Sequence, residues 1–230
     1  MHLSIIIPTL NEQAVIIKTL QTLQPLRQAG HEIIVVDGGS TDNTRTLAAP
    51  LADNVLLHEC GRARQMNFGA QFAQHDILLF LHADTHLPAR ADSLIINGLA
   101  ETGRKWGRFN VRLSGRAWLL RVTGHLINWR TCLTGIATGD QAIFMQRSLY
   151  TQAQGFPDIP LMEDIALSRQ LKRFSRPYSI QTPVITSSRR WEQHGIVRTI
   201  LLMWGLRLAY ALGVNPQTLK KYYADNVEKS

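Results

Sequence analysis

The stretch Ile77-Leu78-Leu79-Phe80-Leu81-His82-Ala83-Asp84-Thr85 decides the fold of this chain. Its five consecutive apolar residues, from Ile77 to Leu81, predict a strand buried on both faces of a sheet. Asp84 follows where such a strand would end, and open α/β sheets bind ligands in the crevice outside the carboxyl ends of their strands. A single aspartate in this place is about as often a turn or helix cap, so the interpretation of Asp84 depends on the rest of the sequence.

Two further apolar runs predict buried strands in the first half of the chain. Residues 3–7 are apolar and largely β-branched, and residues 33–36 lead directly into a second acid, Asp37. A helix is expected between these strands, opened by a capping box from Thr9 to Glu12 and closed by Pro25 and Gly30. The acids that follow the strands would meet at one edge of the sheet if the strands are parallel.

Strands and helices alternate along the remainder of the chain. Further strands are expected at 55–57, 107–113, 142–145 and 179–185, and further helices at 61–70, 88–100, 117–129, 162–174 and 196–212. This alternation, with short loops, predicts an α/β protein with a Rossmann-like, doubly wound, mostly parallel sheet and helices on both faces.

The composition allows a sizeable core and indicates an anionic ligand. Of 230 residues, 45% are apolar and 18% are charged, and the net charge is +8. Such a charge suits nucleotide phosphates, acidic lipid or nucleic acid, but no block of like charges forms a polyanion-binding tail. Cys60 and Cys132 lie far apart, so neither a zinc site nor a disulfide framework is expected.

The location of the protein is predicted from its apolar segments. The chain runs from Met1 directly into a strand, and its richest apolar segment, 196–214, is interrupted by Arg198 and Arg207. We therefore expect a cytoplasmic protein, with peripheral attachment to the inner membrane face as an alternative. The helix at 196–212 is apolar almost all round, so it would be buried, contact a second subunit in a homodimer, or lie on a membrane through residues 196–213.

Several known nucleotide and hydrolase motifs are absent from the sequence. There is no P-loop, no Gly-x-Gly-x-x-Gly after the first strand, no His-Glu-x-x-His, no Gly-x-Ser-x-Gly and no zinc-deaminase spacing. The residues at the expected sheet edge favour a phosphate ligand, because Arg62 and Arg64 lie near a helix N-terminus. One carboxylate together with diphosphate oxygens is a usual environment for a hard divalent cation.

Three segments together resemble the family-2 glycosyltransferases. They run from Ser4 to Glu12, from Val35 to Asp42 and from Leu81 to Asp84, and their order and spacing carry the resemblance. The resemblance implies a GT-A fold, a nucleotide-sugar donor, a Mn²⁺ or Mg²⁺ cofactor and inversion at the anomeric carbon. With Arg189-Arg190-Trp191, the last segment also resembles a short bacterial subgroup associated with arsenosugar biosynthesis.

The resemblance assigns residues to the nucleotide and to the metal. Asp84 matches the last acid of the Asp-x-Asp metal motif, and His194 is a further candidate ligand. His82 stands where the motif has its first acid, which leaves one carboxylate fewer for the ion. The positions that would border the nucleotide are Pro8, Thr9, Asn11, Glu12, Asp37, Arg62, Arg64, Asn67, His82 and Ala83.

The resemblance also assigns the catalytic and acceptor residues. Asp164, in the pair Glu163-Asp164, matches the general base that deprotonates the acceptor hydroxyl. The alternative is that these acids only complement the dipole of the helix that they open. The positions matched to the acceptor or the departing diphosphate are Gly139, Asp140, Arg189, Arg190 and Trp191, for which a plain turn and a core position remain alternatives.

We therefore expect an inverting transferase that moves a sugar, from a UDP-sugar by preference, to an unidentified hydroxyl acceptor. A single GT-A domain would span 1–230, with a nucleotide-sugar half at 1–105, an acceptor and catalytic half at 106–195 and a C-terminal apolar helix and tail at 196–230. No nucleic-acid partner is expected. The alternative is a non-catalytic protein that binds a nucleotide or polyanion and has a degenerate metal motif. A sugar-phosphate nucleotidyltransferase is disfavoured, because residues 8–12 are not its glycine-rich loop.

Overall fold

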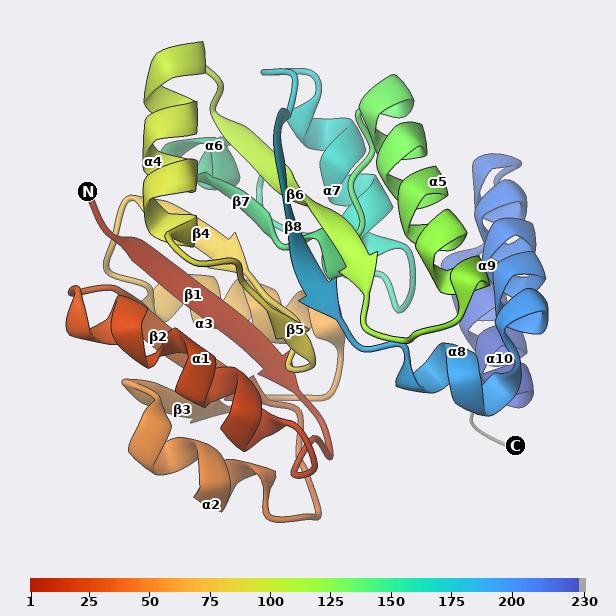
Figure 1. Ribbon diagram of the computed structural model, residues 1–230, viewed down its shortest axis with the longest axis horizontal. Coiled ribbons are helices and arrows are strands. Elements are labelled where there is room, and N and C mark those ends of the chain that lie inside the picture. The colour runs from red at the N-terminus through yellow and green to blue at the C-terminus, as the bar shows by residue number, and fades with distance from the viewer. Residues whose placement is uncertain (228–230) are drawn as a thin grey trace.

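The computed structural model describes residues 1–227, without the side chains of Arg190 and residues 225–227. One eight-stranded sheet crosses the molecule in the order β3-β2-β1-β4-β7-β6-β8-β5 (Figure 1). Its strands are β1 (Leu3–Thr9), β2 (Glu32–Asp37), β3 (Asn54–Leu57), β4 (Ile77–Phe80), β5 (Thr85–His86), β6 (Trp106–Leu113), β7 (Ile143–Gln146) and β8 (Tyr178–Thr186). The helices are α1 (Ile16–Gln28), α2 (Thr44–Ala48), α3 (Arg62–Phe72), α4 (Ala91–Thr102), α5 (Trp118–Thr134), α6 (Arg147–Gln152), α7 (Glu163–Leu171), α8 (Arg189–His194), α9 (Ile196–Ala211) and α10 (Pro216–Val227), with 3₁₀ turns η1 (Ala49–Leu51) and η2 (Gly139–Gln141).

The first four strands of the sheet are parallel, as the sequence predicts. β1 pairs in parallel with β2 and β4, and β2 pairs in parallel with β3. Thr9 lies opposite Asp37 at the carboxyl ends of β1 and β2. The loops after β1, β2 and β4 therefore open on one edge of the sheet, where open α/β sheets bind ligands.

The other half of the sheet is mixed. β7 runs antiparallel to both β4 and β6, whereas β6 and β8 are parallel to each other. β5 is a short edge strand that pairs antiparallel with β8. The prediction of a doubly wound α/β sheet is confirmed, and the antiparallel insertion of β7 makes the sheet mostly, rather than wholly, parallel.

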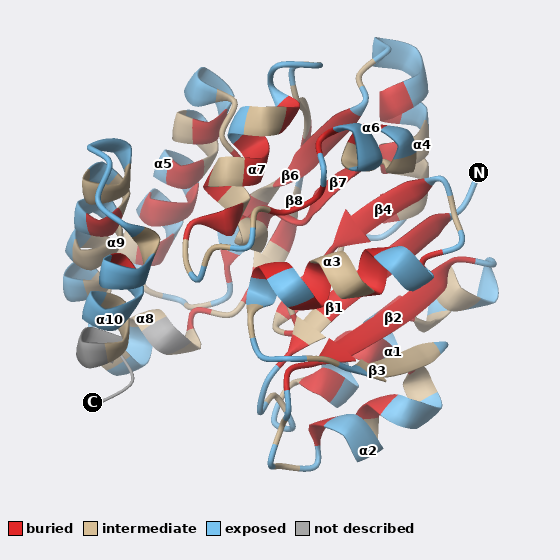
Figure 2. Cartoon of the chain, turned by 180° about the vertical axis from the view of Figure 1, so that it is seen from behind, coloured by how far each residue is buried: buried red, intermediate tan, exposed pale blue. Residues whose placement is uncertain are grey.

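Helices cover both faces of the sheet, whose central strands are buried along most of their length (Figure 2). Alternate strand residues belong to two separate cores. In β1, Ile5 and Ile7 pack with α1 and α4, whereas Ile6 packs on the other face with α3. This alternation follows from the two-residue period of a strand. Strands that are buried on both faces read as continuous apolar runs, which is why the sequence reveals them readily.

The start of α1 differs from the prediction, because the helix begins at Ile16 rather than after Thr9. Of the two residues predicted to close it, Pro25 lies within the helix, whereas Gly30 lies just beyond its last residue, Gln28. No capping box forms, because the Thr9 hydroxyl donates to Asp37 Oδ1 at 3.3 Å and the Glu12 N–H donates to Thr44 Oγ1 at 2.8 Å. Tertiary hydrogen bonds between the first two loops thus replace the local ones that the spacing predicts.

The C-terminal helices form a third apolar cluster. Leu206 of α9 and Leu219 of α10 are buried against Met162 and Ile165 at the start of α7. The prediction that α9 is apolar all round holds for its sequence, but only one of its sides is buried, and Trp204 is 60% exposed. Among the described helices, none has the length and hydropathy that crossing a bilayer requires.

Candidate active site

Asp37 organises the loops at the ends of β1 and β2. Its carboxylate is fully buried and accepts hydrogen bonds from the N–H groups of Gly39 and Ser40, at 3.0 and 2.8 Å. The Ser40 and Thr9 hydroxyls donate to its other oxygen. Asp37 and Thr9, both predicted to border the nucleotide, are therefore buried and hold the ends of β1 and β2 together, and their contact with a nucleotide stays a prediction.

Asn11 joins the loop after β1 to the loop after β2. Its backbone is left-handed, with φ at +54°, a conformation that asparagine tolerates better than most residues. Its N–H donates to Ser40 Oγ at 2.8 Å, and its Oδ1 accepts from the Thr41 N–H at 2.9 Å. Pro8 and Glu12 are half-buried beside it. The residues predicted in these two loops are thus brought together as one rigid rim.

Gln65 supports the same rim and was not expected from the sequence. From α3 its buried amide donates to the carbonyl oxygens of Thr9 and Val36, each at 2.8 Å. These carbonyl groups belong to the last residues of β1 and β2, just before the loops begin. A single glutamine within a helix carries no spacing pattern, and only the close packing of α3 on β1 and β2 reveals its role.

Arg62 lies at the start of α3 and faces the start of α7. Its Nη1 is 3.8 Å from Glu163 Oε1, and its side chain is 45% exposed. Desolvation acts to lower the pKa of Arg62, but the negative charges of Glu163 and Asp164 outweigh it and the pKa is raised. Asp84 acts in the same direction, so Arg62 links the predicted metal ligand with the predicted base electrostatically.

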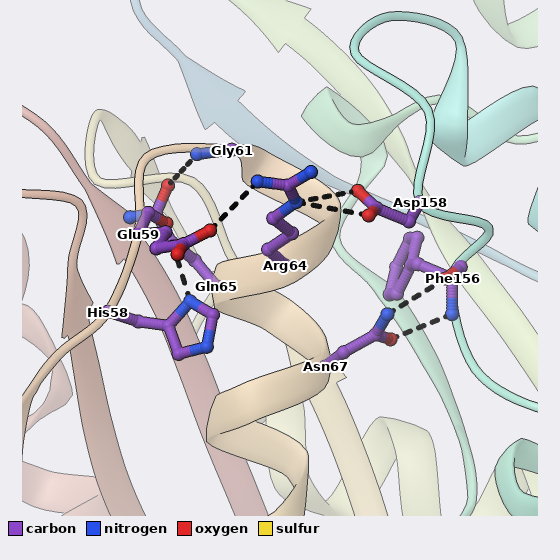
Figure 3. A network of polar contacts seen from close by, with 8 residues as sticks. All are labelled: His58, Glu59, Gly61, Arg64, Gln65, Asn67, Phe156 and Asp158. Carbon is purple, nitrogen blue, oxygen red and sulfur yellow. Dashed lines mark hydrogen bonds and ion pairs between the residues drawn. The ribbon is translucent and has the colours of Figure 1, made fainter.

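Arg64 and Asn67 form hydrogen bonds with the neighbouring segment 156–158 instead of pointing into open space (Figure 3). Arg64 pairs with Asp158, at 2.9 and 3.1 Å, and with Glu59 at 2.9 Å. The Asn67 side chain donates to the Phe156 carbonyl at 2.8 Å and accepts from the Phe156 N–H at 2.9 Å. Both residues thus fasten the segment before α7 to α3, which sets the position of Glu163 and Asp164.

Asp164 lies at the start of α7, after Met162, whose φ is +69°. Its Oδ2 accepts from the Gly139 N–H at 2.8 Å, and its Oδ1 accepts from the Ile165 N–H at 2.7 Å. Burial, and then the charge of Glu163, raise the pKa of Asp164 to about 6, although these hydrogen bonds and Arg62 act to lower it. The small pocket beside it is lined by Met66, Phe80, His82, Gly139, Ile143, Phe156, Glu163 and Asp164.

Asp140 and Arg130 add a second charged pair next to Asp164. Burial raises the pKa of Asp140, whereas Thr138 and Arg130 act to lower it. Burial also lowers the pKa of Arg130, against the charges of Asp140 and Asp164. Among the described residues, no hydrogen-bond partner reaches the buried Asp140 Oδ1. Arg130 is absent from every sequence motif, and only the packing of α5 against η2 identifies it.

The residues predicted to bind the metal are not grouped into one site. Asp84 is half-buried, and its carbonyl accepts from the Ser187 N–H at 3.1 Å, which joins the end of β4 to the end of β8. Ala83 is buried, and His82 packs against Gly139 in the pocket. Within the part of the chain that the structure describes, no three His, Cys, Asp or Glu side chains are grouped to hold a metal, so Asp84 and His194 do not form such a site alone.

The late arginine segment reaches back to the first loop. Arg189 Nη2 is 3.5 Å from Glu12 Oε2, across 177 positions of sequence. Trp191 is half-buried. The Arg190 side chain lies outside the described residues, so its predicted role stays a prediction. The structure thus brings Arg189 to the loop after β1, and its contact with a diphosphate stays a prediction.

Comparison with known proteins defines the family. The family model described as glycosyl transferase family 2 matches residues 4–150, which is more than half of the chain. This chain belongs to glycosyltransferase family 2. The predictions of a GT-A fold and of a family-2 glycosyltransferase are confirmed.

The curated relatives match a shorter region. A PGL/p-HBAD biosynthesis glycosyltransferase of Mycobacterium bovis is 41% identical over 98 residues, which are 40% of this chain and 38% of that protein. A Mycobacterium tuberculosis protein of the same description matches equally. The match therefore spans less than half the length of these relatives.

Solved structures share the fold. TarS of S. aureus (residues 1–349) has a TM-score of 0.65 at 18% identity, over 87% of this chain and 64% of that one. The mannosyltransferase PcManGT of Pyrobaculum calidifontis, in complex with GDP-Man and Mn²⁺, has a TM-score of 0.59 at 22% identity, over 80% of this chain and 56% of that one. At such identities the likeness establishes the fold alone.

Proposed function

We propose that this protein is an inverting glycosyltransferase that uses a nucleoside-diphosphate sugar, with Asp164 as the general base. The observation that carries the proposal is the placement of Asp164 in a pocket with Glu163, where its pKa is raised to about 6 and two backbone N–H groups orient it. A carboxylate with this pKa is mostly ionised at neutral pH, yet it accepts a proton more readily than an ordinary aspartate.

The reaction is a single displacement at the anomeric carbon. The acceptor oxygen forms a bond to that carbon, the bond to the diphosphate oxygen breaks, and the hydroxyl proton passes to Asp164 Oδ. The Gly139 N–H donates to one oxygen of the Asp164 carboxylate and so fixes the orientation of the whole carboxylate group toward the acceptor. Asp140, whose pKa is raised by burial and also by the charge of Asp164, belongs to the acceptor side with Gly139 and Trp191.

The departing diphosphate would be met by cationic side chains. Arg62 lies at the N-terminus of α3, where the helix dipole also favours negative charge, and Arg189 lies at the rim formed by Glu12. Both side chains are partly exposed and could contact a phosphate. A UDP-sugar is proposed because structures of the same fold contain UDP or UDP-GlcNAc.

A divalent cation fits this site in a particular way. Asp84 is a hard oxygen donor at the sheet edge, and among the described residues no cluster of three ligands accompanies it. Mg²⁺ and Mn²⁺ sites of phosphate enzymes often use one or two carboxylates and complete their shell with substrate phosphates and water. Asp84 would therefore hold the ion together with the diphosphate, with His194 as a further candidate, and the ion would supply charge neutralisation of the leaving group.

The test is thermal unfolding against a panel of nucleoside diphosphates with Mn²⁺, Mg²⁺ or chelator. A nucleotide at one hundred times its Kd should stabilise the fold by about 2.7 kcal/mol, a readable shift in midpoint. UDP should stabilise the protein only with metal, metal alone should not, and Asp84→Ala should abolish the effect. Asp164→Asn should retain the shift of the unfolding midpoint by UDP with metal. It should lose sugar transfer, which is measured with water as the acceptor, as hydrolysis of the donor.

One observation favours a second candidate, a non-catalytic nucleotide- or polyanion-binding protein. His82 stands where the family motif has its first acid, so the ion has fewer protein ligands. Stabilisation by a polyanion, with no response to any nucleotide and metal, would favour this candidate over the transferase. The arsenosugar-associated subgroup and the identity of the acceptor stay predictions.

A further inference from the structure

Two neighbouring helices at the end of the sheet carry apolar stripes on their outer sides. On α5 the exposed residues are Trp118, Val122, Leu126, Trp129 and Leu133, between 42% and 68% exposed. On α9 they are Val197, Leu201, Trp204 and Leu208, between 56% and 66% exposed. Together these residues are named the α5–α9 face, and both Figure 1 and Figure 2 show the two helices as neighbours.

The stripes are not side effects of a poorly packed core. Spacings of three and four residues place each stripe on one side of its helix. The opposite sides are occupied: Leu120 and Ile127 of α5 are buried, as is Leu206 of α9. Among the described residues, nine of the eighteen large exposed apolar side chains belong to this face. Patches of this kind mark a surface that is covered in function.

The charges around the face are positive. Neither helix contains an acidic residue, whereas Arg121 and His125 on α5 and Arg198 on α9 are exposed. The wider sequence has the same asymmetry, with 17 basic and 7 acidic residues in 106–230 but 8 basic and 10 acidic residues in 1–105. The whole positive charge of the chain therefore comes from the part that carries this face.

The positive charge around the α5–α9 face indicates which partner covers it. A two-fold dimer would place the same patch of each copy against the other, which would bring arginine toward arginine without acidic partners on these helices. An anionic bilayer instead offers headgroups to the arginines and an interfacial layer to tryptophan, whose amphipathic ring favours that depth. We propose that the α5–α9 face binds the surface of an anionic lipid bilayer, with its helices lying in the interface rather than crossing it.

The sheet topology sets the orientation of the bound protein. β6 and β8 are parallel neighbours, with Leu113 opposite Thr186, and α5 and the α8–α9 pair follow these two strand ends. The Ser187 N–H is hydrogen-bonded to the Asp84 carbonyl at this same edge. Arg116 and Arg121 lie at or just before the start of α5, and Arg198 lies at the start of α9, so these cations are at the helix ends that follow the strands. Glu192 of α8 packs near Gly115 at the same end. Docking through this end would bring the site close to the headgroups.

The test is flotation of the full chain with vesicles of phosphatidylcholine and phosphatidylglycerol in equal parts, compared with phosphatidylcholine alone. Binding to the anionic vesicles, weakened by salt, is expected. Trp118→Ser with Trp204→Ser should lower the partition coefficient about tenfold or more. Arg121→Glu should lower it about fivefold or more. The matched control is Phe72→Ser on α3, which exchanges a 45%-exposed aromatic on the other face of the sheet and should leave partitioning unchanged.

Three results would overturn the proposal. The first is the absence of vesicle binding by a protein that unfolds cooperatively and responds to nucleotide normally. The second is a concentration-dependent dimer in sedimentation that the paired tryptophan substitution dissociates, because the occupant would then be a second copy of the chain. The third is an equal loss of binding in the Phe72→Ser control, since the effect would not belong to this face.

Discussion

Asp164 combines a catalytic assignment with a measurable effect on stability. Its pKa rises from an ordinary value near 4 to about 6 in the folded protein, so the folded state favours the protonated carboxyl. The stability associated with this group is fully present below about pH 4 and is lost as pH rises through about 6. At pH 7 and above, the ionised form therefore costs folding free energy.

The first prediction is that Asp164→Asn stabilises the protein at pH 7 by about 1–3 kcal/mol. Asparagine offers one oxygen to the Gly139 N–H and loses the bond from the Ile165 N–H, but it removes the charge next to Glu163, which is the larger effect at pH 7. The measurement is urea unfolding of both proteins from pH 3.5 to 8, with the difference vanishing toward the acid end. A constant difference across this range would contradict the raised pKa.

Arg62 should control the pKa of this carboxylate. Its charge acts to lower the pKa of Asp164, and its guanidinium lies 3.8 Å from Glu163 Oε1. The second prediction is that Arg62→Gln raises the pKa of Asp164 by about 0.5–1 unit, whereas Arg62→Lys leaves it within a few tenths. The titration of the Asp164 carboxyl ¹³C resonance, assigned by its loss in Asp164→Asn, measures both variants. Equal shifts in the two variants would mean that shape, not charge, is the cause.

At the scale of helices and strands, a close approach fixes α3 against the sheet. A Cβ on Gly69 would lie 2.7 Å from Ile6 Cγ2 and 2.8 Å from Val36 Cγ2. Gly205 of α9 is exposed and would have no neighbour within 4 Å of such a Cβ. An alanine methyl group would thus contact other side chains closely at position 69 of α3 but would lie in open space at position 205 of α9.

The third prediction is that Gly69→Ala destabilises the protein by about 1–2 kcal/mol, since overpacking exceeds the gain in helix propensity. The matched variant Gly205→Ala should stabilise it by about 0.5–1 kcal/mol. Chemical denaturation of both variants provides the free energies. Stabilisation by both would show that α3 has room to move off β1 and β2, and that the rim held by Gln65 is not rigid.

Some helices and strands can be predicted from the sequence, and others cannot. The buried strands and their common direction follow from continuous apolar runs and from alternation with helices, so β1, β2 and β4 are predicted within two residues of their ends. The start of α1 is missed because Thr9 and Glu12 bond to the loop after β2 instead of to each other. The two-residue strand β5 has no pattern long enough to detect.

The candidate site divides in the same way. Asp84 and Asp164 stand out because they belong to segments with recognisable spacing, but Gln65 and Arg130 act through contacts between elements that are distant in sequence. Arg64 matches a family position and nevertheless pairs with Asp158. Sequence patterns report local geometry and shared ancestry, and the partners of an individual side chain depend on how the elements pack.

Over the whole molecule, one sheet joins the two halves that the sequence suggests. β4 of the first half pairs with β7 of the second, and one core contains Leu3 and Ile33 together with Phe144 and Val184. Among the described residues, the first half has no core of its own that would hold it if the second half unfolds. A single cooperative transition is therefore expected for the described fold.

The tryptophans make this expectation testable, because all five lie beyond residue 105, at 106, 118, 129, 191 and 204. The fourth prediction is that tryptophan fluorescence, which reports only the second half, and far-UV circular dichroism give the same unfolding midpoint. UDP with Mn²⁺, bound at loops of the first half, should then shift both midpoints equally, because a ligand of the native state stabilises the entire cooperative unit. A shift seen by circular dichroism but not by fluorescence would divide the chain into two units near residue 105. The sheet argues against that division, since β4 and β7 share four successive residue pairs across it.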